Sequence, residues 1–259
     1  ALGIAIGAPV GGLVVEAFGP RAAFLCVTAA ALLTLTLYLF LPETVEKSAS
    51  GLSEAEKNTE APSVDWGNLI EDPKWQGLSL FEVGEKFGFA AKLASIPVIA
   101  ASVLPGGAVG AGALLSAAGL SGLVGAPLGG WVTDRIGSKN SVIASGVLSS
   151  AGLIAIPFAL QTPLPESLPE GAAFAAAVLL WSTAVAAQKP AATALAQEYA
   201  PDGAEATAMA LPRACGDAVY LFAPFMLGYV ADWAAAPTGL ECAVAGICGL
   251  LGTAALIIL

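Results

Sequence analysis

The stretch LASIPVIAASVLPGGAVGAGALLSAAGLSGLVGAPLGGWVT, residues 93–133, contains no charged side chain. At 1.5 Å per residue, a helix of this length would reach about 60 Å, twice the thickness of the hydrocarbon core of a bilayer. Two membrane-spanning helices therefore fit in the stretch, and we predict the turn between them at Pro105-Gly106-Gly107. Such a stretch is typical of a polytopic membrane protein.

The rest of the chain agrees with this class. Of its 259 residues, 57% are hydrophobic and 12% are charged, and the mean hydropathy is +0.80. Soluble domains carry about 25% charged residues. Together with 93–133, six further apolar segments predict an all-α protein with eight transmembrane helices; the segments are 1–18, 22–41, 139–161, 171–190, 208–231 and 240–259. The polar stretch 43–85 is predicted to be a solvent-exposed loop.

One sequence motif occurs three times in the apolar segments. Residues 7–12 read GAPVGG and are followed by Glu16, and residues 125–130 read GAPLGG and are followed by Asp134. A looser copy has Ala223-Pro224, then Gly228 and Asp232. A repeat of this kind indicates one helical unit that a membrane bundle uses several times.

The basic residues predict the orientation. Nine of the ten fall in what we take as alternate connections: Lys47, Lys57, Lys74, Lys86, Lys92, Arg135, Lys139, Lys189 and Arg213. Cytoplasmic connections carry the excess of Lys and Arg. We therefore expect the 43–85 and 134–139 connections, and both chain ends, on the cytosolic side of a plasma membrane or on the equivalent side of an organelle membrane.

The composition argues against several classes of function. The chain has no histidine and no clustered polar catalytic set, so we expect no catalytic residues, no metal site and no cofactor. Many of the acidic residues that give the chain its net charge of −10 lie between Glu43 and Glu85, so this charge does not argue for a basic partner. The expected partners are the lipid bilayer, a small-molecule solute and, as a candidate coupling ion, the proton; no nucleic acid is expected.

Two motifs resemble those of the major facilitator superfamily. GWVTDRIGSK at 130–139 is similar to the family's G-x-x-x-D-R-x-G-R-R/K loop, and Gly3, Gly7, Gly11 and Gly12 are similar to the glycines of its fifth-helix antiporter motif, with Pro9 displaced by one position. The resemblance implies family helices five to twelve. According to this resemblance, residues 1–42 form the last two helices of an N-terminal bundle, residues 43–85 form the central cytoplasmic loop, and residues 86–259 form a complete six-helix bundle. Because the chain opens inside an apolar run, we expect further sequence before Ala1.

The first candidate site is the 130–139 loop. Its gating residues would be Gly130, Asp134, Arg135, Gly137 and Lys139. An Asp at a helix end and an Arg in the following loop can pair across neighbouring helices and lock one side of the protein. The alternative is a solvated anchor pair that only fixes orientation.

The second candidate site lies inside the membrane. Residues 218–231 give about 21 Å of uncharged helix, which is too short to span alone, so the helix must reach back past Asp217 towards Arg213. The two residues are four apart and can neutralise each other. Lys92 and Gln188 are further pathway candidates. The alternatives are a structural ion pair near the interface and, for Lys92, snorkelling from one turn inside the membrane.

Small residues and prolines are candidates for helix packing and bending. Glycines four residues apart can draw a helix against its neighbour, and prolines can kink the helices that move. These residues are Gly3, Gly7, Pro9, Gly11, Gly12, Gly125, Pro127, Gly129, Pro224 and Gly228.

The resemblance implies a secondary transporter of a small organic solute that works by alternating access, with proton-coupled, antiporter-like efflux as an option. A truncated, non-transporting membrane protein or an assembly partner is the alternative. A membrane-embedded enzyme is disfavoured by the composition described above.

Overall fold

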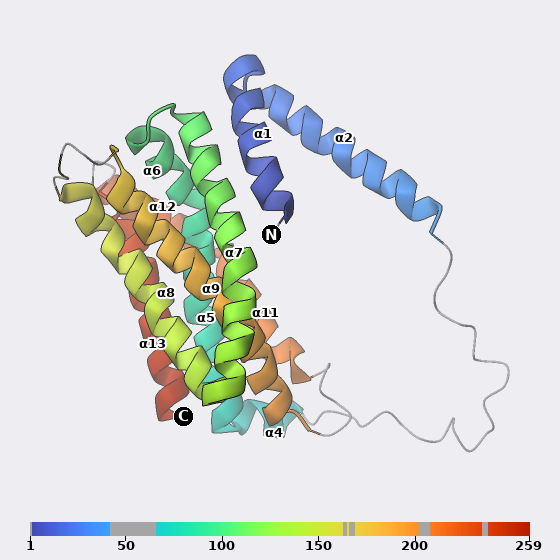
Figure 1. Cartoon of the computed structure of the whole chain (residues 1–259). Helices are drawn as coiled ribbons and strands as arrows, with labels where there is room; N and C mark the ends of the chain where they lie inside the picture. Colours follow the sequence, from blue (N-terminus) through green and yellow to red (C-terminus); the bar gives the residue numbers. More distant parts are fainter. Residues whose placement is uncertain (1, 42–65, 163–164, 166–168, 202–207, 235–237) are drawn as a thin grey trace.

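The computed structural model describes residues 2–41, 66–162, 165, 169–201, 208–234 and 238–259, and every regular element among them is a helix (Figure 1). The all-α prediction is confirmed. The elements are α1 (Leu2–Phe18), α2 (Pro20–Leu39), α4 (Trp66–Glu71), α5 (Pro73–Ala94), α6 (Ile96–Val103), α7 (Ala108–Ile136), α8 (Ser138–Gln161), α9 (Ala172–Tyr199), α11 (Ala210–Ala218), the 3₁₀ turn η2 (Val219–Leu221), α12 (Ala223–Trp233) and α13 (Leu240–Ile258).

The lengths of the helices bear out a polytopic membrane protein. Within the described ranges, five helices are long and apolar enough to cross a bilayer, namely α2, α7, α8, α9 and α13. Two bent pairs, α5 with α6 and α11 with α12, raise the number to seven if each pair forms one span. The first of the eight predicted crossings corresponds to α1, which is a shorter apolar helix of 17 residues.

The predicted loop at 43–85 is wrong in its second part. Residues 66–71 form α4, and α5 begins at Pro73, where the side chain of Asp72 accepts a hydrogen bond of 2.9 Å from the backbone N–H of Lys74. An acidic N-cap followed by proline is a strong helix start. The domain boundary placed at 85/86 therefore falls inside α5, and residues 43–65 lie outside the described residues.

The helices from α5 to α13 pack into one bundle (Figure 1). In it, α8 contacts α9 and α13, α5 contacts α13 and α11, and α7 contacts α9. We call the end that holds Pro73, Ile136 and Ser138 the lower end, and the end that holds Val103 and Ala108 the upper end (Figure 1).

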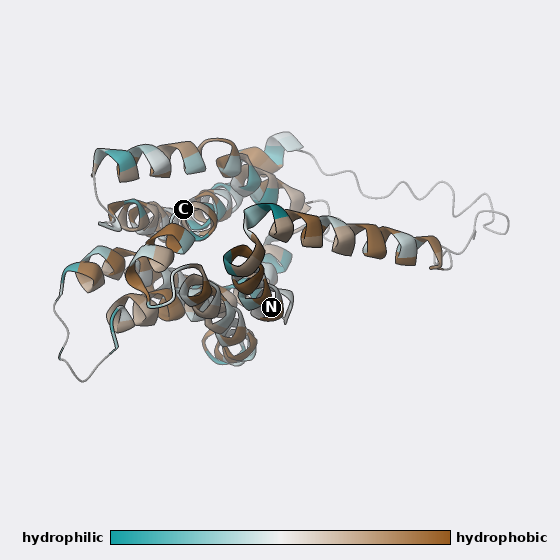
Figure 2. Ribbon diagram, turned by 90° about the horizontal axis from the view of Figure 1, so that it is seen from above, coloured by the Kyte–Doolittle hydropathy of each residue, from teal (hydrophilic) through white to brown (hydrophobic). Residues whose placement is uncertain are grey.

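The N-terminal helices lie beside this bundle. Helix α1 packs against α7, whereas α2 contacts α1 and projects away, as the view from above shows (Figure 2). None of the residues of α2 is buried, although most are apolar. Its surface thus suits lipid or another apolar partner rather than water.

The structure corrects the placement of the basic residues. Lys86 and Lys92 lie inside α5, Lys189 inside α9 and Arg213 inside α11, rather than in connections. Lys74, Arg135 and Lys139 remain at the lower end of the bundle. The predicted orientation therefore rests on fewer described residues than the sequence suggested.

Both bent pairs have a proline just after the break. The axes of α5 and α6 differ by 42°, and α6 carries Pro97 in its first turn. Those of the α11–η2 segment and α12 differ by 41°, and Pro224 stands in the first turn of α12. Proline tolerates the first helical turn but interrupts the preceding hydrogen bonds. Helices α1 and α7 run on through Pro9 and Pro127.

The glycines divide into two groups. At Gly125 and Gly129, an added Cβ would collide with the backbone of α9 at Thr183 and Ala187, so the predicted close contact is present there. At Gly3, Gly7 and Gly11, and also at Gly228, a Cβ would meet no described atom within 4 Å, so the predicted close contact along α1 is not made with the described residues. Helix α1 instead approaches α7 through Gly12, whose Cβ would lie 2.9 Å from the Ala108 oxygen. The repeat reads alike in both helices, but a different face of α1 meets its neighbour.

Candidate functional site

A polar stripe on α5 is the base of the candidate site. Glu82, Glu85, Lys86 and Phe89 are spaced at i, i+3, i+4 and i+7, so they share one face of the helix. This face turns toward the inside of the bundle, where Glu85 is only 6% exposed. Charged residues inside a membrane-spanning bundle are costly and mark a functional pathway by default.

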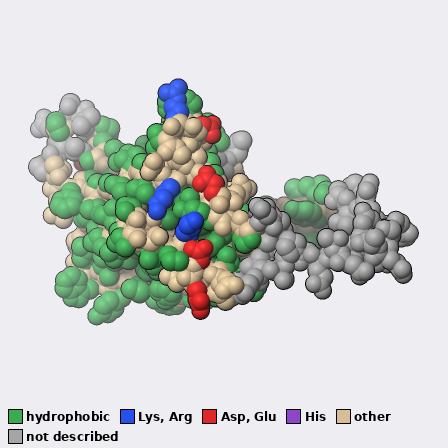
Figure 3. Space-filling view, turned by 90° about the horizontal axis from the view of Figure 1, so that it is seen from below, with side chains coloured by type: hydrophobic (Ala, Val, Ile, Leu, Met, Phe, Trp, Pro, Cys, Tyr) green, Lys and Arg blue, Asp and Glu red, His purple; other side chains and the backbone are tan. Residues whose placement is uncertain are grey.

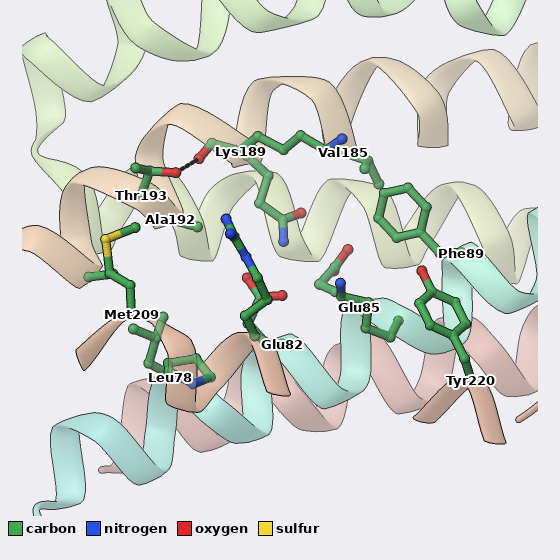
Figure 4. A pocket seen from close by; sticks show the side chains of 15 residues that line it. Leu78, Glu82, Glu85, Phe89, Val185, Lys189, Ala192, Thr193, Met209 and Tyr220 are labelled. Atoms are coloured by element: carbon green, nitrogen blue, oxygen red, sulfur yellow. Dashed lines mark hydrogen bonds between the residues drawn. The ribbon is translucent and has the colours of Figure 1, made fainter. Parts of the chain in front are cut away.

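A cavity of about 450 Å³ opens along this stripe, between α5, α9 and the α11–η2 segment (Figure 4). Glu82, Glu85 and Phe89 point into it from α5, and Val185 and Lys189 line it from α9 (Figure 4). Its volume is within the range of small-molecule sites. The lining also contains Gln188, Arg213 and Tyr220, so the cavity combines polar, charged and aromatic groups.

Glu85 is the most enclosed charged residue of the cavity. Its Oε1 atom accepts a hydrogen bond of 3.0 Å from the hydroxyl of Ser149 on α8, and the amide of Gln188 lies against the same carboxyl group. Gln188 is itself 5% exposed, and its Oε1 atom has no hydrogen-bond partner among the described residues. Gln188 thus faces the cavity as predicted, with an acceptor that is free to take a further donor.

The predicted ion pair between Arg213 and Asp217 is not formed. Asp217 accepts from Lys86 at 2.8 Å, and this is the one ion pair among the described residues. The Nζ atom of Lys86 also lies 5.6 Å from the ring centroid of Tyr220. Arg213 lines the cavity near Glu82 instead. The partner of Asp217 is thus a lysine of α5, the first half of which the sequence predicts to be a loop.

Lys92 lies elsewhere than predicted. It follows Pro73 by 19 residues, or about 28 Å along α5, so it sits towards the upper part of the bundle and not one turn inside its lower end. Its Nζ atom is 5.8 Å from the ring centroid of Trp181, and that of Lys189 is 5.3 Å from the ring centroid of Phe89. Cation–π contacts of this kind stabilise ammonium groups away from water.

The gating candidates lie at the lower end, where α7 meets α8. Gly137 has a φ of 84°, which favours glycine and allows the sharp turn between the two helices. Arg135 stacks on Trp131 of its own helix at 3.9 Å, and Asp134 makes no ion pair with any described residue. Gly130 and Lys139 are open to the surface. The predicted contact across helices is therefore absent from this conformation.

Another link holds the lower end together. The hydroxyl of Ser138, at the start of α8, donates to the carboxylate of Glu198 near the end of α9. Seen from below, acidic and basic side chains gather across this end, amid hydrophobic ones (Figure 3). This polar end contrasts with the apolar flanks of the bundle, as expected of a surface that meets water.

Sequence reasoning missed Glu82, Glu85, Lys86 and Tyr220. The sequence places Glu82 and Glu85 in the 43–85 loop and Lys86 in a connection, because the charged residues up to Lys92 interrupt the apolar run. Their helical spacing and the Asp72-Pro73 helix start were the signals that could have found them. In the described part of the chain, no group of three or more His, Cys, Asp or Glu residues is placed to hold a metal ion.

The fold and the site define an integral, multi-pass membrane protein with a polar cavity inside its bundle. The family model of the Major Facilitator Superfamily matches the chain twice, over residues 1–224 and 87–259. The chain therefore belongs to this superfamily, whose members are membrane transporters, and the resemblance seen in its motifs is confirmed. A comparison with curated proteins finds no match.

Proposed function

We propose that the protein is a secondary transporter that moves a small organic solute by alternating access, and that the cavity between α5, α9 and α11 lies on the solute path. The observation that supports this most is the cavity itself. It brings the buried or half-buried side chains of Glu82, Glu85 and Lys86 together with the exposed side chains of Lys189 and Arg213. Inward-facing charges of this kind serve a substrate or ion pathway in membrane proteins.

Coupling to protons is supported by Glu85. Its carboxyl group is buried and has a serine donor, but it has no cation in ion-pair distance among the described residues. A charge there is poorly compensated, so the carboxyl group would bind a proton in one state and release it when the cavity admits water or solute. In this proposal Glu85 carries the coupling proton, and Ser149 and Gln188 orient its carboxyl group.

The 130–139 segment supports a gating role. Asp134 and Arg135 are exposed and make no ion pair with any described residue, so both are available for contacts in another state. Alternating access needs contacts that form in one conformation and break in the other. Gly137 gives the turn its shape, and Gly130 and Lys139 flank the pair. The role that we propose for this segment is in transport and not in catalysis.

Proteoliposomes with a pH gradient test the proposal. Wild-type protein should accumulate at least one member of a panel of small carboxylates, amines and amides. Glu85→Gln should abolish gradient-driven uptake but retain solute exchange, because the neutral amide mimics the protonated acid. The matched control is Glu71→Gln, an exposed acid outside the cavity. Equal gradient-driven uptake by Glu85→Gln and wild type would exclude Glu85 as the proton carrier. No flux by the wild type would favour the alternative of a non-transporting assembly partner.

A further inference from the structure

Two lysines form one arrangement with two aromatic rings: Lys189 and Phe89 line the cavity, and Lys92 and Trp181 lie next to them outside its lining. Lys189 lies over Phe89 at 5.3 Å, and Lys92 lies over Trp181 at 5.8 Å. The rings of Phe89 and Trp181 contact each other edge to face, with centroids 6.1 Å apart. These four side chains, which we call the lysine–aromatic cluster, therefore connect α5 with α9 through a continuous set of contacts.

Neither ammonium group of the cluster has a carboxylate partner among the described residues. The ion pair in the described part of the chain joins Lys86 and Asp217, and it leaves Lys92 and Lys189 without an acid within 4.0 Å. The nearby carboxylates are engaged elsewhere. Asp217 binds Lys86, and Glu85 accepts from Ser149. Glu82 lines the cavity but forms no ion pair with Lys189 among the described residues.

The two positive charges belong to one connected set of side chains, since the ring under Lys92 contacts the ring under Lys189. Charges inside a membrane bundle are normally paired with one another or with backbone carbonyls. Two like charges that share a site without an acid make a region of positive potential. Such a region is unfavourable when empty and is neutralised when a negative charge enters.

We propose that the transported solute is an organic anion, whose negative group binds between Lys92 and Lys189 while its apolar body lies against Phe89 in the cavity. This inference rests on the proposed function and names the chemical class of its solute. Lysine suits this role because its ammonium is a compact charge with three donors. The cavity lining has three basic side chains against two acidic ones, which favours an anion over a cation: Lys86, Lys189 and Arg213 against Glu82 and Glu85.

Equilibrium dialysis with the purified full chain in detergent tests the inference. The probes are radiolabelled benzoate, benzylamine and benzamide, which share a ring but differ in charge, together with butyrate, butylamine and butyramide. At least one carboxylate should bind, and its amine and amide counterparts should bind at least tenfold more weakly. Inorganic phosphate should not displace the bound carboxylate, because it lacks the apolar body.

Variants of the lysines locate the binding. Lys189→Gln and Lys92→Gln should each weaken carboxylate binding by about tenfold to a hundredfold, as expected for a lost charge-assisted hydrogen bond. Lys189→Arg keeps the positive charge and should retain most of the affinity. If the ring contact were merely structural, the affinity would not have to follow this charge. The matched control is Lys74→Gln, since Lys74 also lies over a ring, that of Tyr199 at 5.5 Å, but outside the cavity. It should bind like the wild type.

The outcomes separate the two proposals. If an amine or amide bound while its carboxylate did not, the anion inference would be overturned. If Arg213→Gln also abolished that binding, the cavity would still be the solute site. Carboxylate binding that is equal in the lysine variants and the wild type would also overturn it. Binding of no probe would contradict the anion inference, whereas uptake of a solute by proteoliposomes would still support the transporter.

Discussion

Replacing Gly129 by alanine tests whether the α7–α9 contact depends on the absence of a side chain. A Cβ at Gly129 would overlap the backbone of Ala187, which cannot move aside as a flexible side chain could. The two helices must therefore separate, and overpacking of this kind costs about 1–3 kcal/mol. For a domain of this size, each kcal/mol corresponds to about 2–4 °C in Tm. Gly129→Ala should thus unfold several degrees below the wild type.

Gly130 supplies the matched control, since it is the next residue of the same helix and a Cβ there would meet nothing within 4 Å. Gly130→Ala should keep or raise the Tm, because alanine favours a helix over glycine by about 1 kcal/mol. Thermal unfolding of both variants in one detergent, followed by tryptophan fluorescence and size-exclusion chromatography, gives the comparison. Equal Tm values for the two variants would refute the role assigned to the close contact.

Three further predictions concern the ion pair, the gate and the orientation. In a double-mutant cycle of unfolding, Lys86→Ala and Asp217→Ala should show a coupling free energy of up to about 1 kcal/mol, a small value because the Asp217 side chain is 56% exposed. The unfolding free-energy changes of Arg213→Ala and Asp217→Ala should add within about 0.5 kcal/mol. Stronger coupling in this second pair would restore the contact predicted from the sequence. Asp134→Asn should lower flux far more than expression, because the carboxylate would make a state-dependent contact; normal flux would reduce Asp134 to a solvated anchor. With the native cysteines replaced, Lys139→Cys and Glu170→Cys should react with an impermeant reagent from opposite sides of the membrane, and labelling of both from one side would overturn the predicted orientation.

Most of the helical architecture could be predicted from the sequence. Long apolar segments, charges at their ends and the Pro105-Gly106-Gly107 turn are local signals, and the structure has α6 and α7 on either side of that turn, with Gly106 and Gly107 at positive φ. The family motifs gave the superfamily. The start of α5 was missed because its lower half is charged, and a hydropathy pattern cannot distinguish a polar loop from a helix that turns a charged face inward.

The site was harder to predict because its contacts are made between helices. Lys86 and Asp217 are 131 residues apart, and nothing in the spacing of Arg213 and Asp217 reveals that a closer lysine competes for the acid. The glycine stripe of α1 shows the same limit. Gly3, Gly7 and Gly11 have the spacing of a packing motif, but which face meets α7 depends on how the helix is rotated in the bundle. Periodicity defines a face and does not define its neighbour.

The central claim is that the cavity between α5, α9 and α11 is a water-accessible part of the solute path. Thr193→Cys places a thiol on the cavity lining, and Leu251→Cys places one on the exposed apolar face of α13. Both variants, without the native cysteines, are reconstituted in proteoliposomes and treated with a charged, impermeant methanethiosulfonate reagent. We predict that Thr193→Cys reacts and loses solute flux, while Leu251→Cys neither reacts nor changes. An unreactive Thr193→Cys, or one that reacts and keeps full flux, would contradict the claim.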